Sequence, residues 1–126
     1  MAYVLVVEDD KDAADALCAY LRGSRHLAES APNGREALLS ILTRTPDVVV
    51  LDLFMPGMDG RSLLAVLRSY LRLQSLPVVV LTGLPPDDAM AETLKVNTIL
   101  IKGRASLQDV LQAVERELED HKKVTD

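Results

Sequence analysis

The stretch Val48-Val49-Val50-Leu51-Asp52 is a run of four aliphatic residues that ends on an acid. Three other short apolar runs also lead to a charged or hydroxyl side chain: residues 3–7 precede Glu8-Asp9-Asp10, residues 78–81 end at Thr82, and residues 99–101 end at Lys102. Continuous runs of valine, isoleucine and leucine of this length are typical of parallel strands buried on both faces. The four runs therefore predict a buried parallel sheet.

The segments between these runs carry apolar residues at helical spacing, so strand and helix patterns alternate along the chain. A weaker strand pattern at residues 27–31 completes a set of five. Such alternation predicts a sheet covered by helices on both faces, and five strands are too few for a closed eight-stranded barrel. The predicted fold is therefore α/β: a flavodoxin-like, doubly wound five-stranded parallel sheet with strand order 2-1-3-4-5 and five helices.

The expected helix ends depend on residues that start or stop helices. Gly23 stands where a C-cap is expected after the first helical pattern. Pro85-Pro86-Asp87-Asp88 suits the start of a helix that runs only to about Lys95, because proline is tolerated in the first turn. We expect the last helix to begin at about Ser106 and the tail, residues 121–126, to be frayed.

The composition indicates one compact domain in a reducing compartment. The 126 residues are 48% hydrophobic, with a formal net charge of −5 and a pI near 5.0. Such a chain lacks the overall basic charge of a nucleic-acid binder. It shows no secretory signal and no apolar run long enough for a bilayer, so we expect no membrane partner and a cytoplasmic location. The single cysteine, Cys18, is expected to be a small core residue.

The predicted sheet brings acidic residues together. The carboxyl ends of parallel strands share one edge, and with this strand order Asp9 and Asp52 face each other at the switch point. Two carboxylates about 4 Å apart repel by roughly 4 kcal/mol at an effective dielectric constant near 20, so the site needs a proton or a cation. Oxygen ligands without clustered histidine or cysteine favour Mg²⁺, or Mn²⁺, over zinc.

The same edge carries groups that suit a phosphoryl group. Lys102 supplies a positive charge and Thr82 a hydroxyl, beside a carboxylate that can act as a nucleophile. The residues after the first strand contain no G-x-G-x-x-G or G-K-[ST] pattern, which argues against a dinucleotide or nucleoside triphosphate site. No plausible Ser-His-Asp or Cys-His set is evident either.

Simpler explanations exist for several of these residues taken singly. The acids of residues 8–10 could merely begin the first helix, where they complement its dipole. Thr82 is an ordinary β-branched residue at a strand end, and Lys102 alone would be a solvated lysine. Asp59 suits a turn or a helix N-cap better than a metal site. Asp52 is the hardest to explain in this way, because an acid that ends a buried strand costs free energy unless it is partnered.

Four segments together resemble the receiver domain of two-component response regulators: residues 6–10, 51–60 and 81–83, and Lys102. The resemblance covers essentially the whole chain and implies a single receiver domain over residues 1–126. It implies that Asp52 is the phospho-acceptor and that Asp9, Asp52 and the backbone carbonyl of Phe54 bind Mg²⁺ directly, with Glu8 acting through water. It also implies that Thr82 and Lys102 contact the phosphoryl oxygens.

The resemblance implies a signalling switch that acts through protein–protein contacts and is not a conventional enzyme. A sensor histidine kinase or a phosphotransfer protein would donate the phosphoryl group, and a downstream output protein would read the change; a homodimer is left open. One alternative is a receiver used as a phosphorylation-independent scaffold. Another is a phosphatase with an aspartyl nucleophile, but Leu53-Phe54 supplies no general acid just after Asp52.

The chain departs from the family pattern in three ways. Ile99 stands at the switch position, where the family usually has an aromatic residue, and Gly103 replaces the proline that usually follows the lysine in a cis peptide. The stretch between Thr82 and Lys102 is also slightly short. We expect a trans 102–103 peptide, because a cis bond without proline costs about 3–4 kcal/mol. We also expect an atypical output face around the fourth helix and the fifth strand.

Two apolar residues are expected to flank the acceptor. Phe54 and Leu84 offer no amide or acid to orient an attacking water molecule. The sequence therefore predicts a long-lived phosphoryl group.

Overall fold

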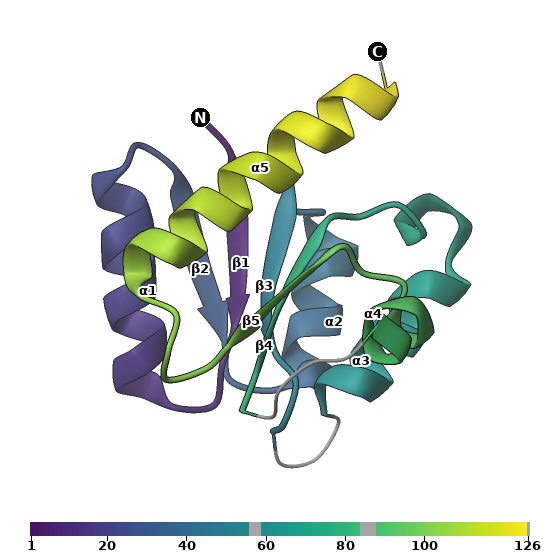
Figure 1. The fold of residues 1–126 in the computed structure, drawn as a ribbon, viewed down its shortest axis with the longest axis horizontal. Helices are drawn as coiled ribbons and strands as arrows, with labels where there is room; N and C mark the ends of the chain where they lie inside the picture. Colours follow the sequence, from purple (N-terminus) through teal and green to yellow (C-terminus); the bar gives the residue numbers. More distant parts are fainter. Residues whose placement is uncertain (56–58, 84–87, 126) are drawn as a thin grey trace.

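The computed structural model describes residues 1–55, 59–83 and 88–125. Its core is one parallel sheet in the order β2-β1-β3-β4-β5, which confirms the predicted fold (Figure 1). The strands are β1 (Tyr3–Val7), β2 (Leu27–Ala31), β3 (Val48–Asp52), β4 (Val78–Thr82) and β5 (Thr98–Ile101). The helices are α1 (Lys11–Gly23), α2 (Gly34–Thr43), α3 (Gly60–Ser69), α4 (Asp88–Leu94) and α5 (Leu107–Thr125), with a short 3₁₀ helix, η1 (Leu71–Leu73).

Helices cover both faces of the sheet, as alternating strands and helices require. Successive side chains of β1 point to opposite faces: Val4 and Val6 pack with α1 and α5, whereas Leu5 and Val7 pack with α2 and α3. Figure 1 shows α5 crossing in front of the sheet, with the fainter α2 behind it. Because both faces are covered, the strands are aliphatic throughout.

The strand register aligns the carboxyl ends of the inner strands. Val7 of β1 lies opposite Leu51 of β3, so the residues that follow β1 reach the level of Asp52. On the other side, Thr82 of β4 lies opposite Ile101 of β5, directly before Lys102. The acids that follow β1, Asp52, the Thr82 hydroxyl and the Lys102 ammonium group therefore all lie at the edge formed by the carboxyl ends of the strands.

Side-chain caps fix where the helices begin. The carboxylate of Asp10 accepts a hydrogen bond from the Ala13 amide at the start of α1, and that of Asp59 accepts one from the Ser62 amide at the start of α3. Asp59 is thus the N-cap residue that its position suggested, and Asp10 belongs to the helix start. At the start of α5, Ser106 and Asp109 exchange hydrogen bonds in a capping box.

One expected helix end is wrong. Gly23 is the last residue of α1 rather than its cap; Ser24 is the C-cap, and Arg25 takes the left-handed conformation with φ of 71°. Helix α5 extends to Thr125, and fraying from residue 121 onwards stays a prediction. The end of α4 at Leu94 agrees with the expected short helix. The proposed helix start at residues 85–87 lies outside the described residues.

The core and the surface agree with the composition. Cys18 is buried in the cluster beneath α1 and α5, and burial raises the pKa of its thiol.

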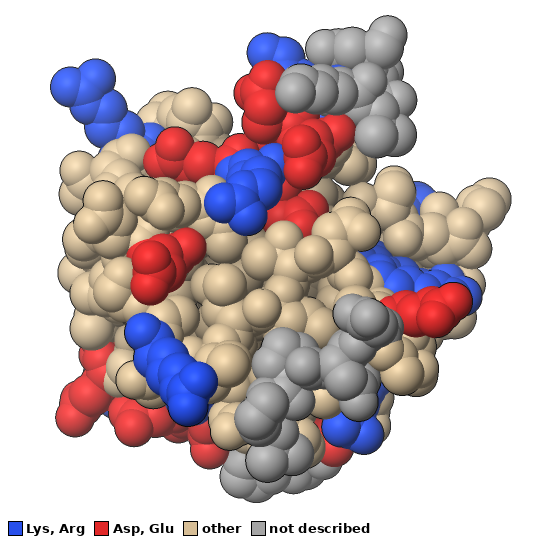
Figure 2. Space-filling model, viewed as in Figure 1, with Lys and Arg blue, Asp and Glu red and all other residues tan. Residues whose placement is uncertain are grey.

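Among the described residues, no helix is both long and apolar enough to cross a membrane. On the face drawn in Figure 2, acidic and basic side chains are interspersed rather than gathered into one basic patch.

A glycine allows α3 to begin directly against the end of β3. The Gly60 amide donates a hydrogen bond to the Leu53 carbonyl over 2.9 Å. A Cβ atom at Gly60 would lie 2.7 Å from both the Asp52 carbonyl oxygen and the Leu53 Cα. These are backbone atoms that cannot turn away, so the close approach requires glycine.

We therefore expect Gly60→Ala to lower the free energy of unfolding by about 1–3 kcal/mol, the usual cost of overpacking. The matched control is Gly23→Ala, because a Cβ there meets nothing within 4 Å. That substitution is expected to be neutral or stabilising by up to about 1 kcal/mol. Urea denaturation of both variants measures the difference, and equal effects would contradict the close approach.

Candidate functional site

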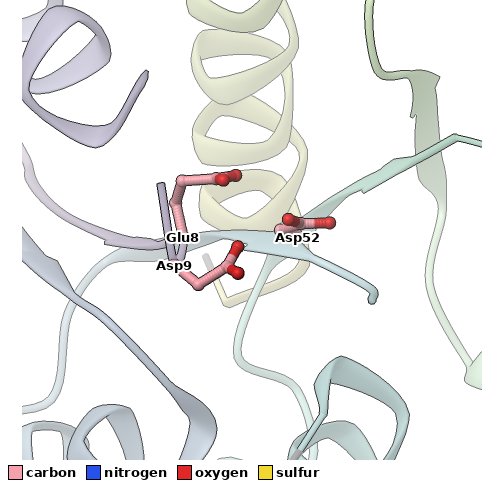
Figure 3. A group of neighbouring side chains, drawn as sticks. All are labelled: Glu8, Asp9 and Asp52. Carbon is pink, nitrogen blue, oxygen red and sulfur yellow. The ribbon is translucent and has the colours of Figure 1, made fainter. Parts of the chain in front are cut away.

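Three carboxylates meet where β1 and β3 end. Glu8 and Asp9 follow β1, Asp52 is the last residue of β3, and Figure 3 shows the first two side chains extending toward the third. One carboxylate oxygen from each residue lies within 4.8 Å of the others. Glu8 and Asp52 are only 6% and 3% exposed, whereas Asp9 is exposed. The predicted meeting of Asp9 and Asp52 across the switch point is therefore confirmed.

Backbone groups hold the two buried acids in place. The Glu8 amide donates to the Ala31 carbonyl at the end of β2, and a carboxylate oxygen of Glu8 accepts from the Asp10 amide over 3.1 Å. The Oδ1 atom of Asp52 accepts from the Phe54 amide over 3.3 Å. These short-range bonds orient the acids toward the shared edge instead of toward solvent.

Lys102 supplies the positive charge in this cluster. Its Nζ lies 2.7 Å from Asp52 Oδ2 and 3.0 Å from both carboxylate oxygens of Glu8. The Lys102 amide also donates to the Thr82 carbonyl over 2.8 Å, which anchors the lysine to the end of β4. Charge-assisted bonds of this length are among the stronger polar contacts in proteins. The lysine therefore joins the two buried acids.

The ionisation of the cluster follows from these contacts. Burial raises the pKa of Glu8, and hydrogen bonds from Lys102 and from the Asp10 amide oppose that shift only in part. Burial alone would lower the pKa of Lys102, but its bonds to Asp52 and Glu8 outweigh burial and raise it. Lys102 therefore stays an ammonium group at neutral pH, in contact with the carboxylates of Glu8 and Asp52.

The donor set fits a hard divalent cation. Glu8, Asp9 and Asp52 offer only oxygen atoms, and within the described residues they are the only group of three such acidic, histidine or cysteine ligands. One ammonium group leaves part of their negative charge uncompensated when all three are ionised. Oxygen ligands at one side of an open edge suit Mg²⁺ or Mn²⁺ rather than zinc.

Thr82 and Phe54 lie at the same edge, whereas Ile99 lies within the sheet, opposite Val80. Thr82 is fully buried at the end of β4. The Phe54 amide lies against Asp52, while the Phe54 ring is 45% exposed. Ile99, at the switch position, is half-buried and packs on the α2–α3 side of the core. Leu84 lies outside the described residues.

The turn after Lys102 differs from the family pattern, in which a proline follows the lysine. No described peptide bond is cis, so the predicted trans 102–103 peptide is confirmed. Gly103 adopts φ of +91°, a conformation that proline cannot reach. The amides of Arg104 and Ala105 then both donate to the Ile101 carbonyl, which closes the turn before α5. With glycine at position 103, the backbone therefore follows a path that a proline at this position could not take.

Two structural contributions were not foreseen from the sequence. The close approach at Gly60 sets the backbone immediately after Asp52, and a glycine directly after an N-cap aspartate was its only signal. Arg68 donates to the carbonyls of Leu73, Leu76 and Lys95, and so ties α3 to the segments before β4 and β5. Its partners are backbone oxygens, which leave no trace in side-chain patterns.

A family model agrees with this architecture. The model described as the response regulator receiver domain matches residues 4–115. This chain belongs to the response regulator receiver domain family. The chain is therefore a receiver domain, the domain that carries the signal in two-component systems.

Curated relatives share this domain as part of longer chains. The "Gliding motility regulatory protein" of Myxococcus xanthus is 30% identical over 115 residues, which cover 90% of this chain and 15% of the relative. The "Response regulator MprA" of Mycolicibacterium vanbaalenii is 42% identical over 80 residues, covering 64% of this chain and 34% of the relative. The matched part of the chain thus spans 15% and 34% of the length of these two relatives.

A solved structure shares the fold over nearly the whole chain. The receiver domain of the Francisella response regulator 1452 superposes with a TM-score of 0.85 at 31% identity. The match covers 95% of this chain and 98% of the other. The five-stranded receiver fold is therefore common to both.

We expect Lys102→Met to lower the free energy of unfolding by about 1–3 kcal/mol, because it leaves two buried acids without their counter-ion. The control is Lys11→Met, which removes an ion pair with Asp15 whose side chains are 86% and 58% exposed. That change is expected to stay within about 0.5 kcal/mol. Urea denaturation at pH 7 measures both.

Repeating the denaturation of these variants with added Mg²⁺ gives a second test of the same charge balance. The ion should stabilise Lys102→Met more than it stabilises the unchanged protein, because a cation then replaces the lost ammonium charge. Equal losses in the Lys102 and Lys11 variants, or no response to Mg²⁺, would contradict the assigned electrostatics.

Proposed function

We propose that this receiver domain accepts a phosphoryl group on Asp52 in a Mg²⁺-dependent reaction and thereby switches its contacts with other proteins. The observation that carries the proposal is the position of Asp52 Oδ2, 2.7 Å from Lys102 Nζ and within a cluster of acids. A buried carboxylate in such a setting has the positive partner that a phosphoryl acceptor needs.

The donor in this proposal is a phosphohistidine. A carboxylate oxygen of Asp52 attacks the phosphorus atom and forms the P–O bond of an acyl phosphate as the P–N bond breaks. The electron pair of that bond stays on the imidazole, which takes up one proton. The step needs no base, because the attacking group is a carboxylate oxygen, held beside the Lys102 ammonium, rather than a hydroxyl.

Asp9, Asp52 and the Phe54 carbonyl would hold Mg²⁺, with Glu8 acting through water. The bound ion would neutralise charge on the carboxylates and on the phosphoryl oxygens. The Lys102 ammonium, already at Asp52 Oδ2, would move onto a phosphoryl oxygen, and the Thr82 hydroxyl would donate to another. Two of the phosphoryl oxygens would then be bound by side chains of this protein, one by Lys102 and one by Thr82.

The switch that follows would differ from the usual one. Ile99 has neither a ring nor a hydroxyl group, so movement of Thr82 would be passed on by aliphatic packing alone. Phosphorylation would act by changing local charge and drawing nearby loops inward. The resulting change would be read around α4 and β5.

The partners follow from the family. Relatives that carry the same domain within longer chains support a role in two-component signalling. We propose a sensor histidine kinase or a phosphotransfer protein as the donor, and a downstream output protein as the reader, in the cytoplasm. Residues 1–126 would act as one receiver unit, and a homodimer is compatible with this arrangement.

Acceptance of the phosphoryl group can be tested by mass. Incubation with acetyl phosphate and Mg²⁺ should add about 80 Da to the intact protein. Chelation of Mg²⁺ should suppress the adduct, and Asp52→Asn should abolish it. Asp59→Asn is the matched control: it removes the same charge from the α3 N-cap, where asparagine also caps well, and should leave the adduct unchanged.

An unmodified mass at full Mg²⁺ would overturn the proposal and leave a phosphorylation-independent scaffold, which Ile99 and Gly103 would then favour. An adduct that survives Asp52→Asn would move the acceptor to another residue. Turnover of a generic phosphate ester would instead favour phosphatase activity.

The phosphoryl group is expected to be long-lived. The Phe54 side chain lies next to the acceptor and offers no group that orients water; the Arg61 guanidinium lies 5.5 Å from its ring centroid. Phe54→Asn should speed loss of the adduct on the order of tenfold by positioning a water molecule, whereas Phe54→Leu should not. The decay of the 80 Da adduct measures both rates, and rapid loss from the unchanged protein would contradict the expectation.

A further inference from the structure

Beside the acidic edge, where the Arg61 guanidinium lies 5.5 Å from the Phe54 ring centroid, a groove runs between α3 and α4. Its volume is about 660 Å³, and its described lining shares no residue with the candidate phosphorylation site. Sites for small organic ligands commonly measure about 300–1,000 Å³ and are lined mainly by apolar groups. Leu64, Ala65, Met90 and Leu94 supply such a lining. The groove therefore has the size and the polarity of a ligand site.

Three cations line the same groove. Arg68 and Lys95 lie together where α3 and α4 end, since the Arg68 guanidinium donates to the Lys95 carbonyl over 3.3 Å. Arg61 lies at the beginning of α3. No aspartate or glutamate is among the described lining residues. A cluster of three positively charged side chains is unusual for this protein, because the chain as a whole has a net charge of −5.

None of these cations is in a salt bridge within the described part of the chain, although Arg68 and Lys95 also line a neighbouring cavity that contains Glu117 and Asp120. Arg68 is half-buried and donates only to backbone carbonyls, and its Nε is buried without a partner. Burial lowers the pKa of Arg68, and Glu117 opposes that shift only from beyond ion-pair distance. An anion in the groove would offset the cost of this half-buried charge.

We propose that the α3–α4 groove is a binding site for a small amphipathic organic anion. An apolar body would pack on Ala65 and Met90, which are accessible apolar residues of the groove, and a carboxylate, sulfonate or similar group would lie near Arg68 and Lys95, with Arg61 adding longer-range attraction. The proposal does not depend on phosphoryl transfer, because the two sites share no described residue.

Two fluorescent probes separate charge from apolar contact. The anion 1-anilinonaphthalene-8-sulfonate and its neutral counterpart N-phenyl-1-naphthylamine have the same aromatic body, but only the first carries a sulfonate. The folded protein should bind the anion at one site, with amide chemical-shift changes confined to α3, α4 and the residues that join them to neighbouring strands. The neutral probe should bind roughly tenfold more weakly, the ratio expected for a few partly exposed charge contacts.

Variants locate the site. Arg61→Gln and Lys95→Gln should each weaken binding of the anion roughly threefold, as expected for partly exposed charges. Ala65→Trp should abolish binding, because Ala65 is exposed and a large side chain there fills the groove without entering the core. The controls are Arg104→Gln and Leu39→Trp, exposed positions outside the groove, which should leave binding unchanged. Arg68 is left in place because it holds three carbonyls.

The proposal is overturned if the anion does not bind, or if Ala65→Trp and Leu39→Trp bind it equally. Equal binding of the two probes, with no effect of the charge variants, would reduce the groove to a non-selective apolar surface and also overturn it. If binding instead falls as protein concentration rises and sedimentation shows a dimer, a second copy covers the groove, and the assignment to a small anion is wrong. Circular dichroism melts of every variant show whether a loss of binding reflects unfolding.

Discussion

The structure depends on the electrostatic balance between three clustered carboxylates and one ammonium group. Glu8 and Asp52 are buried, and each would be costly to ionise alone. Lys102 contacts both acids at 2.7–3.0 Å and holds together the ends of β1, β3 and β5. Asp9 adds a third, exposed carboxylate that the lysine does not contact in any described salt bridge. The remaining negative charge is what a bound cation would offset in the proposed phosphoryl transfer.

The backbone brings these charges together. Parallel strands put all their carboxyl ends at one edge, and the register between β1 and β3 sets Glu8 and Asp9 beside Asp52. Gly60 then lets α3 start against the backbone of Asp52, so the chain leaves the site without displacing it. The aliphatic core that supports the edge is the same one that makes the strands recognisable in the sequence. Packing of the same aliphatic core therefore both stabilises the fold and positions the site residues.

The sequence revealed the site because the informative residues directly follow buried strands. Aliphatic runs identified four of the five strands, and the polar residue at the end of each run identified the groups at the edge; β2, with the sequence LAESA, gave only a weak pattern. Helix ends were harder: Gly23 suggested a cap, but the left-handed residue is Arg25, and the amides of Arg25 and His26 donate to the Arg22 and Leu21 carbonyls in a helix end of the Schellman type that does not use the glycine. The bonds of Arg68 to distant carbonyls and the groove between α3 and α4 could not be predicted, since both arise from how separate elements pack.

The account is tested most directly by a crystal structure of the protein grown with Mg²⁺. It predicts one ion about 2.0–2.1 Å from carboxylate oxygens of Asp9 and Asp52, with the Phe54 carbonyl as a further ligand. It also predicts that Lys102 keeps its contact with Asp52 beside the bound ion. An ion bound elsewhere, or a structure in which Asp9 and Asp52 point apart and share no cation, would contradict it.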